Sequence, residues 1–402
     1  MAASGHAKKA LGVGVFYSFI GTMVGLVILM GVAPQLSKIA IKFSPLEYCA
    51  LAIFSLVLVI ALAGKDMIKG LISGTLGLMF ATVGLSPIDS MKRFTFGNVN
   101  LTGGFQLLTL LIGLYAITEI AAAAFEAVHP KDMTIRKTEK VKGFGFSLKE
   151  FKDNIGNMSI SALIGTAIGI LPGIGGGTAG LLAYSVEKSR SKHPEKYGTG
   201  CMEGVVASET SNNAVIGGAM VPLLTLGIPG DGATAMLLGG LMIHGLQPGP
   251  LLYSQHPELV GGIMAAYFMA NVVMYIMELG LMKAFVRMVN VKLSFLFPAI
   301  VACCVLGVYT LNNRMFDVWV MIIFGFVGYL LICLGIDMAP VILGFILGPL
   351  IEKYMRMALI SANGNWADMF NRPVSVFFVV IAILFVVVPV IKKTVTRGKE
   401  KA

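Results

Sequence analysis

The sequence predicts an all-α polytopic membrane protein, and three properties of the chain support this fold class. Of its 402 residues, 56% are hydrophobic and only 13% are charged, whereas soluble domains usually carry about 25% charged residues. The mean hydropathy is +0.83. Apolar runs of about 20 residues, the length that crosses a bilayer, recur along the whole chain. These runs are continuously apolar and do not alternate, which disfavours a transmembrane β-barrel.

Each apolar segment is expected to be helical, and together they amount to about 9–11 transmembrane segments. The segments are 10–33, 45–64, 68–85, 103–125, 155–186, 204–246, 259–282, 295–311, 315–335, 338–352 and 373–391. Two of them are interrupted, 155–186 at 171–177 and 204–246 at 229–232. Proline and clustered glycine end helices. In lipid, a broken helix is tolerated only where its freed backbone groups are buried in protein or line a wet cavity.

Basic residues are concentrated in three stretches between or after the apolar segments. Seven lie in 126–157, four in 187–203 and five in the tail after residue 391. Because the cytoplasmic loops of membrane proteins carry an excess of Lys and Arg, all three stretches are expected in the cytoplasm, as are both chain termini. This placement explains the net charge of +10, so no nucleic-acid partner is predicted.

The segment 155–186 is predicted to be a re-entrant hairpin, since the basic stretches on both sides of it are placed in the cytoplasm. Each arm of about 14–15 residues is roughly 22 Å long, which is less than the hydrocarbon core of about 30 Å. The segment therefore enters the membrane, turns at 171–177 and returns to the same side. The segment 204–246 is predicted to cross once, as a broken helix.

A weak internal repeat relates residues 36–87 to residues 285–340. Both stretches contain a basic amphipathic lead-in, an apolar span, a short Lys/Arg break and a second apolar span. In the predicted topology the copies run in opposite directions, as in the inverted repeats of many secondary transporters. Residues 1–154 are then the C-terminal part of an incomplete first repeat plus a cytoplasmic linker. Residues 155–402 are the second repeat.

Several stretches of the chain form a specific pattern. They read Gly165-x-x-x-Gly169-x-Leu171-Pro172-Gly173-Ile174-Gly175, Ala207-Ser208-Glu209-Thr210-Ser211-Asn212-Asn213-Ala214, Leu226-Gly227-Ile228-Pro229-Gly230, Phe43-Ser44-Pro45-Leu46-Glu47-Tyr48 and Arg93-Phe94-Thr95-Phe96-Gly97. With them, the sequence resembles the large membrane subunit of the tripartite tricarboxylate transporters, the TctA family, over essentially its whole length. Members of that family commonly extend further at the N-terminus, so the resemblance implies that about 100 N-terminal residues of the first repeat are absent from this chain.

The resemblance implies a multi-pass transporter of the bacterial inner (cytoplasmic) membrane. Its substrate would be an organic carboxylate, citrate-like tricarboxylates being the namesake of the family, and its import would be coupled to Na⁺ or H⁺. A small membrane subunit and a periplasmic solute-binding protein are the implied partners, and a homodimer is left open. No cofactor and no catalysed reaction are expected.

Two other functions stay open at this point, a truncated non-transporting remnant or scaffold subunit and an intramembrane enzyme. An intramembrane enzyme needs a nucleophile with a base or a metal cluster. No His lies near Ser208 or Ser211 in the sequence, and no His-Glu-x-x-His motif occurs. The enzyme is therefore the less favoured of the two.

The candidate substrate site consists of the two glycine-proline breaks and the polar block between them. The N-terminus of a half-helix exposes backbone N–H groups and partial positive charge, which together can bind a carboxylate. Hydroxyl and amide groups of the block can donate to a carboxylate or ligate Na⁺. The candidates are Pro172, Gly173, Gly175, Gly176, Gly177, Thr178, Ser208, Thr210, Ser211, Asn212, Asn213, Pro229 and Gly230. The alternative is that the glycines serve helix packing or a hinge and that the block is a solvated helix start.

Three residues, Glu209, Asn213 and Asp231, are candidates for binding the coupling ion. Glu209 can carry a proton or bind a cation, whereas Asp231 matches the N-cap of the following helix equally well. Of the other acidic residues near spans, Glu278 is expected close to an interface and Glu119 at membrane depth. The five cysteines and five histidines do not cluster, so no disulfide and no metal site beyond a transported Na⁺ is predicted.

Overall fold

The computed structural model describes residues 7–62, 67–86, 88–128, 146–172, 175–289 and 293–399. Within these ranges the regular structure is almost entirely helical, which confirms the predicted all-α class. The described strands are β1 (Gly84–Leu85) and β2 (Lys92–Arg93), an antiparallel pair in which Gly84 is opposite Arg93. The chain divides into two compact units. Unit 1 comprises Met1–Ala40, Val128–Thr234 and Gly245–Phe295, and unit 2 comprises Ile41–Ala127, Ala235–His244 and Leu296–Ala402.

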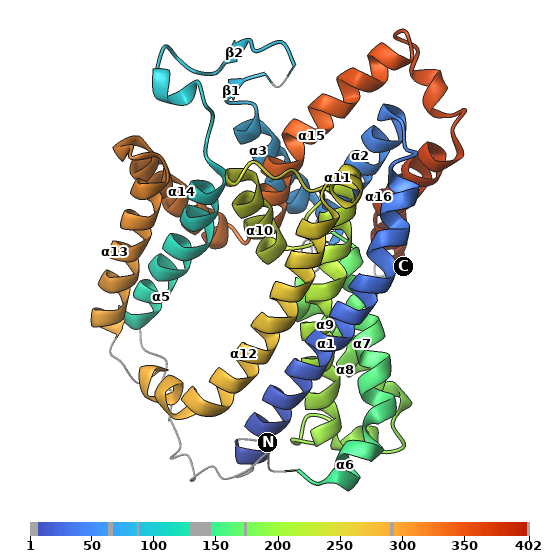
Figure 1. Ribbon diagram of the computed structural model, residues 1–402, viewed down its shortest axis with the longest axis vertical. Helices are drawn as coiled ribbons and strands as arrows, with labels where there is room; N and C mark the ends of the chain where they lie inside the picture. The colour runs from blue at the N-terminus through green and yellow to red at the C-terminus, as the bar shows by residue number, and fades with distance from the viewer. Residues whose placement is uncertain are drawn as a thin grey trace. The chain divides into compact units, whose positions relative to one another are not determined.

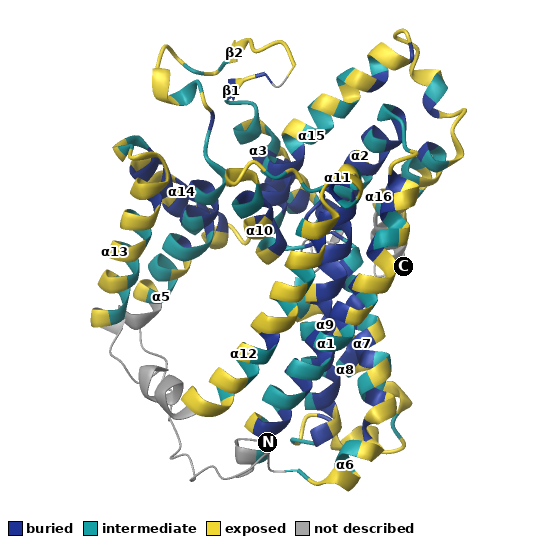
Figure 2. Cartoon of the chain, viewed as in Figure 1, coloured by how far each residue is buried: buried dark blue, intermediate teal, exposed yellow. Residues whose placement is uncertain are grey.

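Unit 1 is built around α9 (Met202–Leu226), a helix of 25 residues that is buried along most of its length. The long helix α1 (Ala7–Ala40) packs along one side of α9, and α7 (Ile155–Ile170) and α8 (Gly175–Arg190) pack along another (Figure 1). Helix α12 (Pro257–Val289) packs against α1. Figure 2 shows the contrast in burial, with α9 mostly buried and α12 mostly exposed. The smaller elements are α6 (Leu148–Asp153), η4 (Pro194–Lys196) and α11 (Pro250–Gln255).

Glycines allow the helices of unit 1 to approach α9 closely. A Cβ at Gly21 or Gly25 of α1 would overlap backbone atoms of α9. The same holds for Gly165 of α7, where a Cβ would overlap the Ser211 carbonyl group. Small residues at such contacts are typical of packed membrane helices, because they let two backbones come together.

Unit 2 contains the remaining helices, which pack on one another without a single central helix. They are α2 (Pro45–Leu62), α3 (Met67–Ala81), η2 (Val99–Leu101), α4 (Leu107–Leu111), η3 (Ile112–Ile117), α5 (Thr118–Val128), α13 (Leu293–Asn312), α14 (Met315–Cys333), α15 (Ala339–Ser361), η5 (Trp366–Met369), α16 (Pro373–Lys399) and most of α10 (Gly232–Ile243). Helix α15 packs on α2 and α3, α16 packs on α2, and α14 packs on η3. The η3 stretch is a π-helical turn. Directly after it, Thr118 Oγ1 of α5 donates to the carbonyl of Gly113 in η3 at 3.2 Å and to that of Gly325 in α14 at 3.1 Å.

Five described helices are long and apolar enough to cross a membrane by themselves, which agrees with the predicted polytopic membrane protein. They contain the stretches Lys9–Ala40, Leu107–Phe125, Pro257–Leu281, Phe295–Asn312 and Met315–Cys333. Further apolar helices are shorter, among them Pro45–Ala61, Met67–Ala81, Ile155–Ile170, Gly232–Ile243 and Pro373–Val388. Every predicted apolar segment therefore contains at least one helix.

The two compact units do not coincide with the division of the sequence into repeats. Unit 1 takes residues from both 1–154 and 155–402, and so does unit 2. A compact unit reflects which helices touch, whereas a repeat reflects a sequence pattern, so the two divisions address different questions. The inverted repeat remains a prediction from the sequence.

Candidate functional site

The first glycine-proline break separates α7 from α8. Helix α7 ends at Ile170, because Leu171 is extended and the following Pro172 cannot continue a helix. Gly175 starts α8 with a φ of +68°, a left-handed conformation that favours glycine. Gly176 is partly buried, and Gly177 and Thr178 are exposed. The predicted site residue Gly173 lies outside the described residues.

The tip of α8 lies against the polar block of α9. A Cβ on Gly176 would overlap Oδ1 of Asn212, so the two residues are in direct contact. One turn further along α8, Ser211 Oγ donates to the Ala179 carbonyl at 3.0 Å. Ser208 continues the same side of α9, where a Cβ on Gly180 would lie 3.1 Å from its carbonyl oxygen. We call Ser208, Ser211 and Asn212 the hairpin face of α9.

The second break follows the end of α9. Gly227 ends this helix with a φ of +72°, and its N–H donates to the Leu223 carbonyl at 3.0 Å. Pro229 then prevents the helix from continuing. Pro229 and Gly230 are both buried, and a Cβ on Gly230 would lie 2.7 Å from the carbonyl oxygen of Gly169. The structure thus brings the second break against the last turn of α7, next to the first break.

Asp231 forms a helix cap. Its Oδ1 accepts a hydrogen bond from the Thr234 backbone N–H at 2.8 Å and from Thr234 Oγ1 at 2.7 Å. In return, the Asp231 N–H donates to Thr234 Oγ1 at 2.9 Å. This reciprocal pattern satisfies the Thr234 N–H, one of the open donors at the start of α10, and the N–H of the cap residue itself. The geometry therefore favours the N-cap, one of the two roles that the sequence predicts for Asp231.

The remaining residues of the polar block point to α1 instead. Ser18 Oγ donates to Glu209 Oε2 at 3.2 Å, and Asn213 Nδ2 donates to Ser18 Oγ at 2.9 Å. Thr210 is fully buried beside Gly21, and its Oγ1 has no hydrogen-bond partner among the described residues. We call Glu209, Thr210 and Asn213 the α1 face of α9. The predicted site is thus divided between two faces of one helix.

Helix α12 carries polar groups that sequence reasoning did not assign to the site. Atoms Tyr267 Oη, Asn271 Oδ1 and Glu278 Oε2 are buried and lack a hydrogen-bond partner in the described chain. Asn271 Nδ2 donates to the Phe19 carbonyl of α1 at 3.2 Å. The spacing of four and seven residues places all three on one face of the helix. That helical spacing inside an apolar span was the sequence signal that could have found them. Glu119, by contrast, is exposed on α5.

The first turn of α1 and helix α6, which precedes α7, are joined by an ion pair between Lys9 and Glu150. Glu150 lies in α6, where it also completes a capping box with Ser147. The hydrogen bond from Lys9, together with those from Ser147, lowers the pKa of the Glu150 carboxyl from 4.5 to about 2. This contact ties α1 to the segment that leads into α7.

A comparison of the sequence with protein-family models matches most of the chain to one family. Residues 1–343, which include both breaks and all of α9, match the sequence model of the Tripartite tricarboxylate transporter TctA family. The chain belongs to the TctA family. It is therefore a multi-pass membrane protein from a family of transporters, and its family functions as one part of a tripartite system.

Two curated relatives of this TctA-family chain come from Agrobacterium vitis. The uncharacterized 52.8 kDa protein in the TAR-I ttuC' 3' region is 34% identical over 388 residues, which are 96% of this chain and 76% of that protein. The uncharacterized protein in the TAR-II ttuC' 3' region is 40% identical over 211 residues, which are 52% of this chain and 87% of that protein. No solved structure matches the chain significantly.

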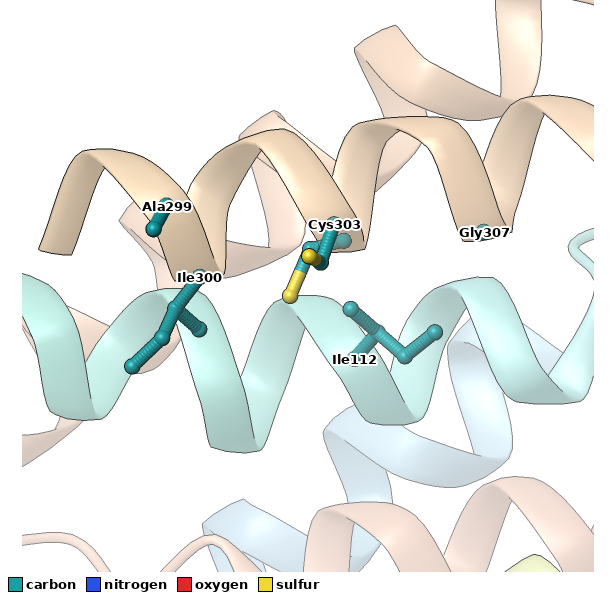
Figure 3. Close-up of a pocket in the computed structure, with 6 residues that line it drawn as sticks. Ile112, Ala299, Ile300, Cys303 and Gly307 are labelled. Carbon is teal, nitrogen blue, oxygen red and sulfur yellow. The ribbon is translucent and has the colours of Figure 1, made fainter. Parts of the chain in front are cut away.

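One pocket of this TctA-family chain lies in unit 2, away from the polar block in sequence. Residues of η3 and α13 line it, as Figure 3 shows: Ile112, Ala299, Ile300, Cys303, Cys304 and Gly307. Its lining is almost wholly apolar, so it offers no donor to a carboxylate. The arrangement in unit 1 is therefore the better candidate for binding an anionic substrate.

Proposed function

We propose that this chain is the large membrane subunit of a binding-protein-dependent secondary transporter that imports organic carboxylates of the tricarboxylate, citrate-like class. In this proposal the chain works in the bacterial inner membrane with both termini in the cytoplasm. Its partners are a small membrane subunit and a periplasmic solute-binding protein, and import is driven by Na⁺ or H⁺. Membership of the TctA family supports each of these roles.

The observation that carries the proposal is that the start of α8, just after the first break, lies against the hairpin face of α9, while the second break lies against the last turn of α7. The N-terminus of α8 is made of glycines, so its first backbone N–H groups are not covered by side chains. Thr178 and Asn212 are exposed beside it and can donate further hydrogen bonds. This is the donor set that an incoming carboxylate needs.

The site binds its anion without a basic side chain. No Lys or Arg occurs between residues 154 and 187. A helix N-terminus contributes typically about 0.3–1 kcal/mol to the binding of a negative charge, and more where it is partly buried. Modest affinity suits a transporter, because the substrate has to leave the site as well as enter it.

We also propose that α7 and α8 form a re-entrant hairpin. Each has 16 residues, which corresponds to about 24 Å and is less than the hydrocarbon core of about 30 Å. Single cysteines at Ser147 and Ser191, introduced after replacement of the native cysteines, test this topology. Both are expected to react with an impermeant thiol reagent from the cytoplasmic side only. Labelling from opposite sides would make the pair a plain crossing.

Uptake into proteoliposomes tests the function itself. The complex of both membrane subunits is reconstituted, and uptake of citrate, a dicarboxylate and a monocarboxylate is measured with the binding protein present. Tricarboxylate uptake is expected, and it should fall at least about 100-fold in Gly176→Val, because the new side chain displaces Asn212 from the tip.

The matched control is Gly156→Val on α7, where a Cβ would meet no atom within 4 Å. Normal uptake is expected for this variant. If no carboxylate is taken up by the wild-type complex under a Na⁺ or a proton gradient, the proposed function is wrong. If Gly176→Val transports normally, the tip of α8 is not part of the site.

A further inference from the structure

The polar seam between α1, α9 and α12 has no role in the carboxylate site described above. It consists of Ser18, Glu209, Thr210, Asn213, Asn271 and Glu278. All of these residues belong to unit 1. The three residues of α9 among them form its α1 face, whereas the proposed carboxylate site lies on its hairpin face.

We propose that Glu209 and Glu278 form a carboxylate pair that binds one proton, and that this proton is the ion coupled to carboxylate import. The proposal rests on the transport function proposed above and selects one of its two coupling ions. It also adds Glu278, Ser18 and Asn271, three residues on two other helices, to the ion site.

The first argument is the incomplete bonding of the two carboxylates. Glu209 Oε2 accepts a hydrogen bond from Ser18 Oγ at 3.2 Å. Glu278 Oε2 is buried and accepts none from the described residues. Both side chains face the same part of α1: Ser18 bonds to Glu209, and Asn271, which shares a face of α12 with Glu278, donates to the carbonyl of Phe19, the neighbour of Ser18. Two like charges near each other in a site of low dielectric are costly, so such a pair usually takes up a proton.

The second argument is the burial of further polar atoms in the same seam. Asn271 is only 3% exposed, and its amide N–H donates to the residue that follows Ser18. Among the described residues, Asn271 Oδ1 has no hydrogen-bond partner, and neither has the hydroxyl of the fully buried Thr210. Buried polar groups are normally satisfied, so a seam with open acceptors is suited to a bound proton or to water that conducts it.

The third argument is that no described cation neutralises the pair. Besides the pair, the titratable groups with described side chains on α1, α9, α11 and α12 are Lys9, Tyr17, Lys38, Glu203, Tyr253, Glu258, Tyr267 and Tyr275. Lys8 of α1 and Lys283 and Arg287 of α12 have side chains outside the described part of the chain. Lys9 pairs with Glu150, and Lys38 lies five helical turns beyond Ser18. The opposite side of α12 is apolar and exposed, with Phe268, Met269, Val273, Ile276 and Met277 facing outward. Protonation is therefore the simplest way to remove one charge.

The position of the pair suits coupling. Glu278 lies near the end of the apolar stretch Pro257–Leu281, and Glu209 lies two turns from the start of α9. Residues 211 and 212 of the hairpin face directly follow Glu209 and Thr210 on the same helix. A change of charge on one face can therefore shift α9 against the hairpin on the other.

The closing experiment measures protonation separately from transport. The purified full-length chain is titrated with pH, and infrared difference spectroscopy records the stretching band of protonated carboxyl groups. The wild type is expected to show a band that is lost in Glu278→Gln and in Glu209→Gln. It should persist in Glu258→Gln, a control on the exposed start of α12. A band that is unchanged in Glu278→Gln and Glu209→Gln overturns the proposal.

Reconstituted uptake then tests the coupling. An inward proton gradient is expected to drive carboxylate accumulation in the wild type and in Glu258→Gln. Glu278→Gln should keep exchange of internal for external substrate but lose gradient-driven accumulation by at least about tenfold. Accumulation that follows only a Na⁺ gradient overturns the proposal while leaving the proposed transport function intact. If the chain transports no carboxylate, the proposed transport function is wrong. The infrared titration still decides whether the carboxylate pair holds a proton.

Discussion

The two faces of α9 differ in what surrounds their polar residues. On the hairpin face, Asn212 is exposed beside glycines of α8, and its side chain is free to meet a ligand. On the α1 face, Thr210 is fully buried, and Asn213 and Glu209 are held through Ser18. Neighbouring residues of one polar block therefore have different environments. The comparison teaches that a continuous polar motif in a helix need not form one site, because its residues face different neighbours.

The largest expected effect concerns the close helix packing on the two sides of α9, against α7 on one side and α1 on the other. Gly165→Leu on α7 and Gly217→Leu on α9 should each abolish folding of the chain. The new side chains would overlap the Ser211 carbonyl group and the backbone of Gly25, respectively. Overpacking typically costs about 1–3 kcal/mol, and more where backbone must move. Thermal unfolding and the yield of monodisperse protein in detergent measure the effect.

Gly156→Leu is the control for these variants, because a Cβ there meets no atom within 4 Å. It is expected to leave the yield unchanged. A normal yield for Gly165→Leu would mean that α7 does not pack against α9, and the hairpin face would lose its partner.

The next effect separates two neighbouring asparagines. Asn212→Ala should raise the KM for carboxylate about tenfold or more, which is the loss of one hydrogen bond to a charged group, and should leave stability unchanged. Asn213→Ala should lower the free energy of unfolding by about 1 kcal/mol, because it removes the bond to Ser18. Substrate titration of uptake and thermal unfolding of both variants provide the two readouts. If Asn213→Ala instead raised the KM and Asn212→Ala instead lowered the stability, the substrate would bind at the α1 face and not at the hairpin face.

A smaller effect is expected at Asp231, which lies at the second break. Asp231→Ala should destabilise the chain by about 1 kcal/mol through loss of the N-cap, whereas Asp231→Asn should be nearly neutral. Uptake should be unchanged in Asp231→Asn, since an amide oxygen accepts the Thr234 bonds equally well. Loss of uptake in Asp231→Asn with full stability would restore Asp231 as an ion ligand.

The smallest effect is a pH dependence of stability at the Lys9–Glu150 pair. The pKa of Glu150 is about 2 in the folded chain and ordinarily 4.5. A lowered carboxyl pKa stabilises the folded state above pH 4.5, and this stabilisation is lost as the pH falls toward 2. Because the pair is partly exposed, it contributes less than about 1 kcal/mol. Glu150→Gln should remove this part of the acid sensitivity, as unfolding midpoints between pH 2 and pH 6 would show. An unchanged profile would show that the pair does not tie α1 to the hairpin.

Much of the fold follows from the sequence, because its signals are local. Pro172 and the adjacent glycines end α7, and Gly227 with Pro229 ends α9, for reasons of backbone geometry that act within a few residues. The apolar segments became helices near the predicted bounds, since a bilayer requires about 20 apolar residues for each crossing. The cap at Asp231 was one of two predicted roles, and an aspartate just before the next half-helix was enough to suggest it.

The division of the candidate site was only partly within reach of the sequence. Residues 208, 211 and 212 share one side of a helix and residues 209 and 213 share another, as the helical period requires. The sequence does not say which helix faces each side, because glycines permit many close contacts. The contacts of Gly176 with Asn212 and of Ser18 with Glu209 join residues far apart in the chain.

The sequence by itself determined the membrane class, the two helix breaks and the polar residues between them, because composition and chain geometry act locally. Only the tertiary structure decided that the second break lies against α7, that α1 and the hairpin occupy different sides of α9, and that Asn271 and Glu278 of α12 have buried polar atoms without partners. The physical reason is that helix packing depends on the fit of whole surfaces, and buried polar atoms can be counted only once those surfaces have met.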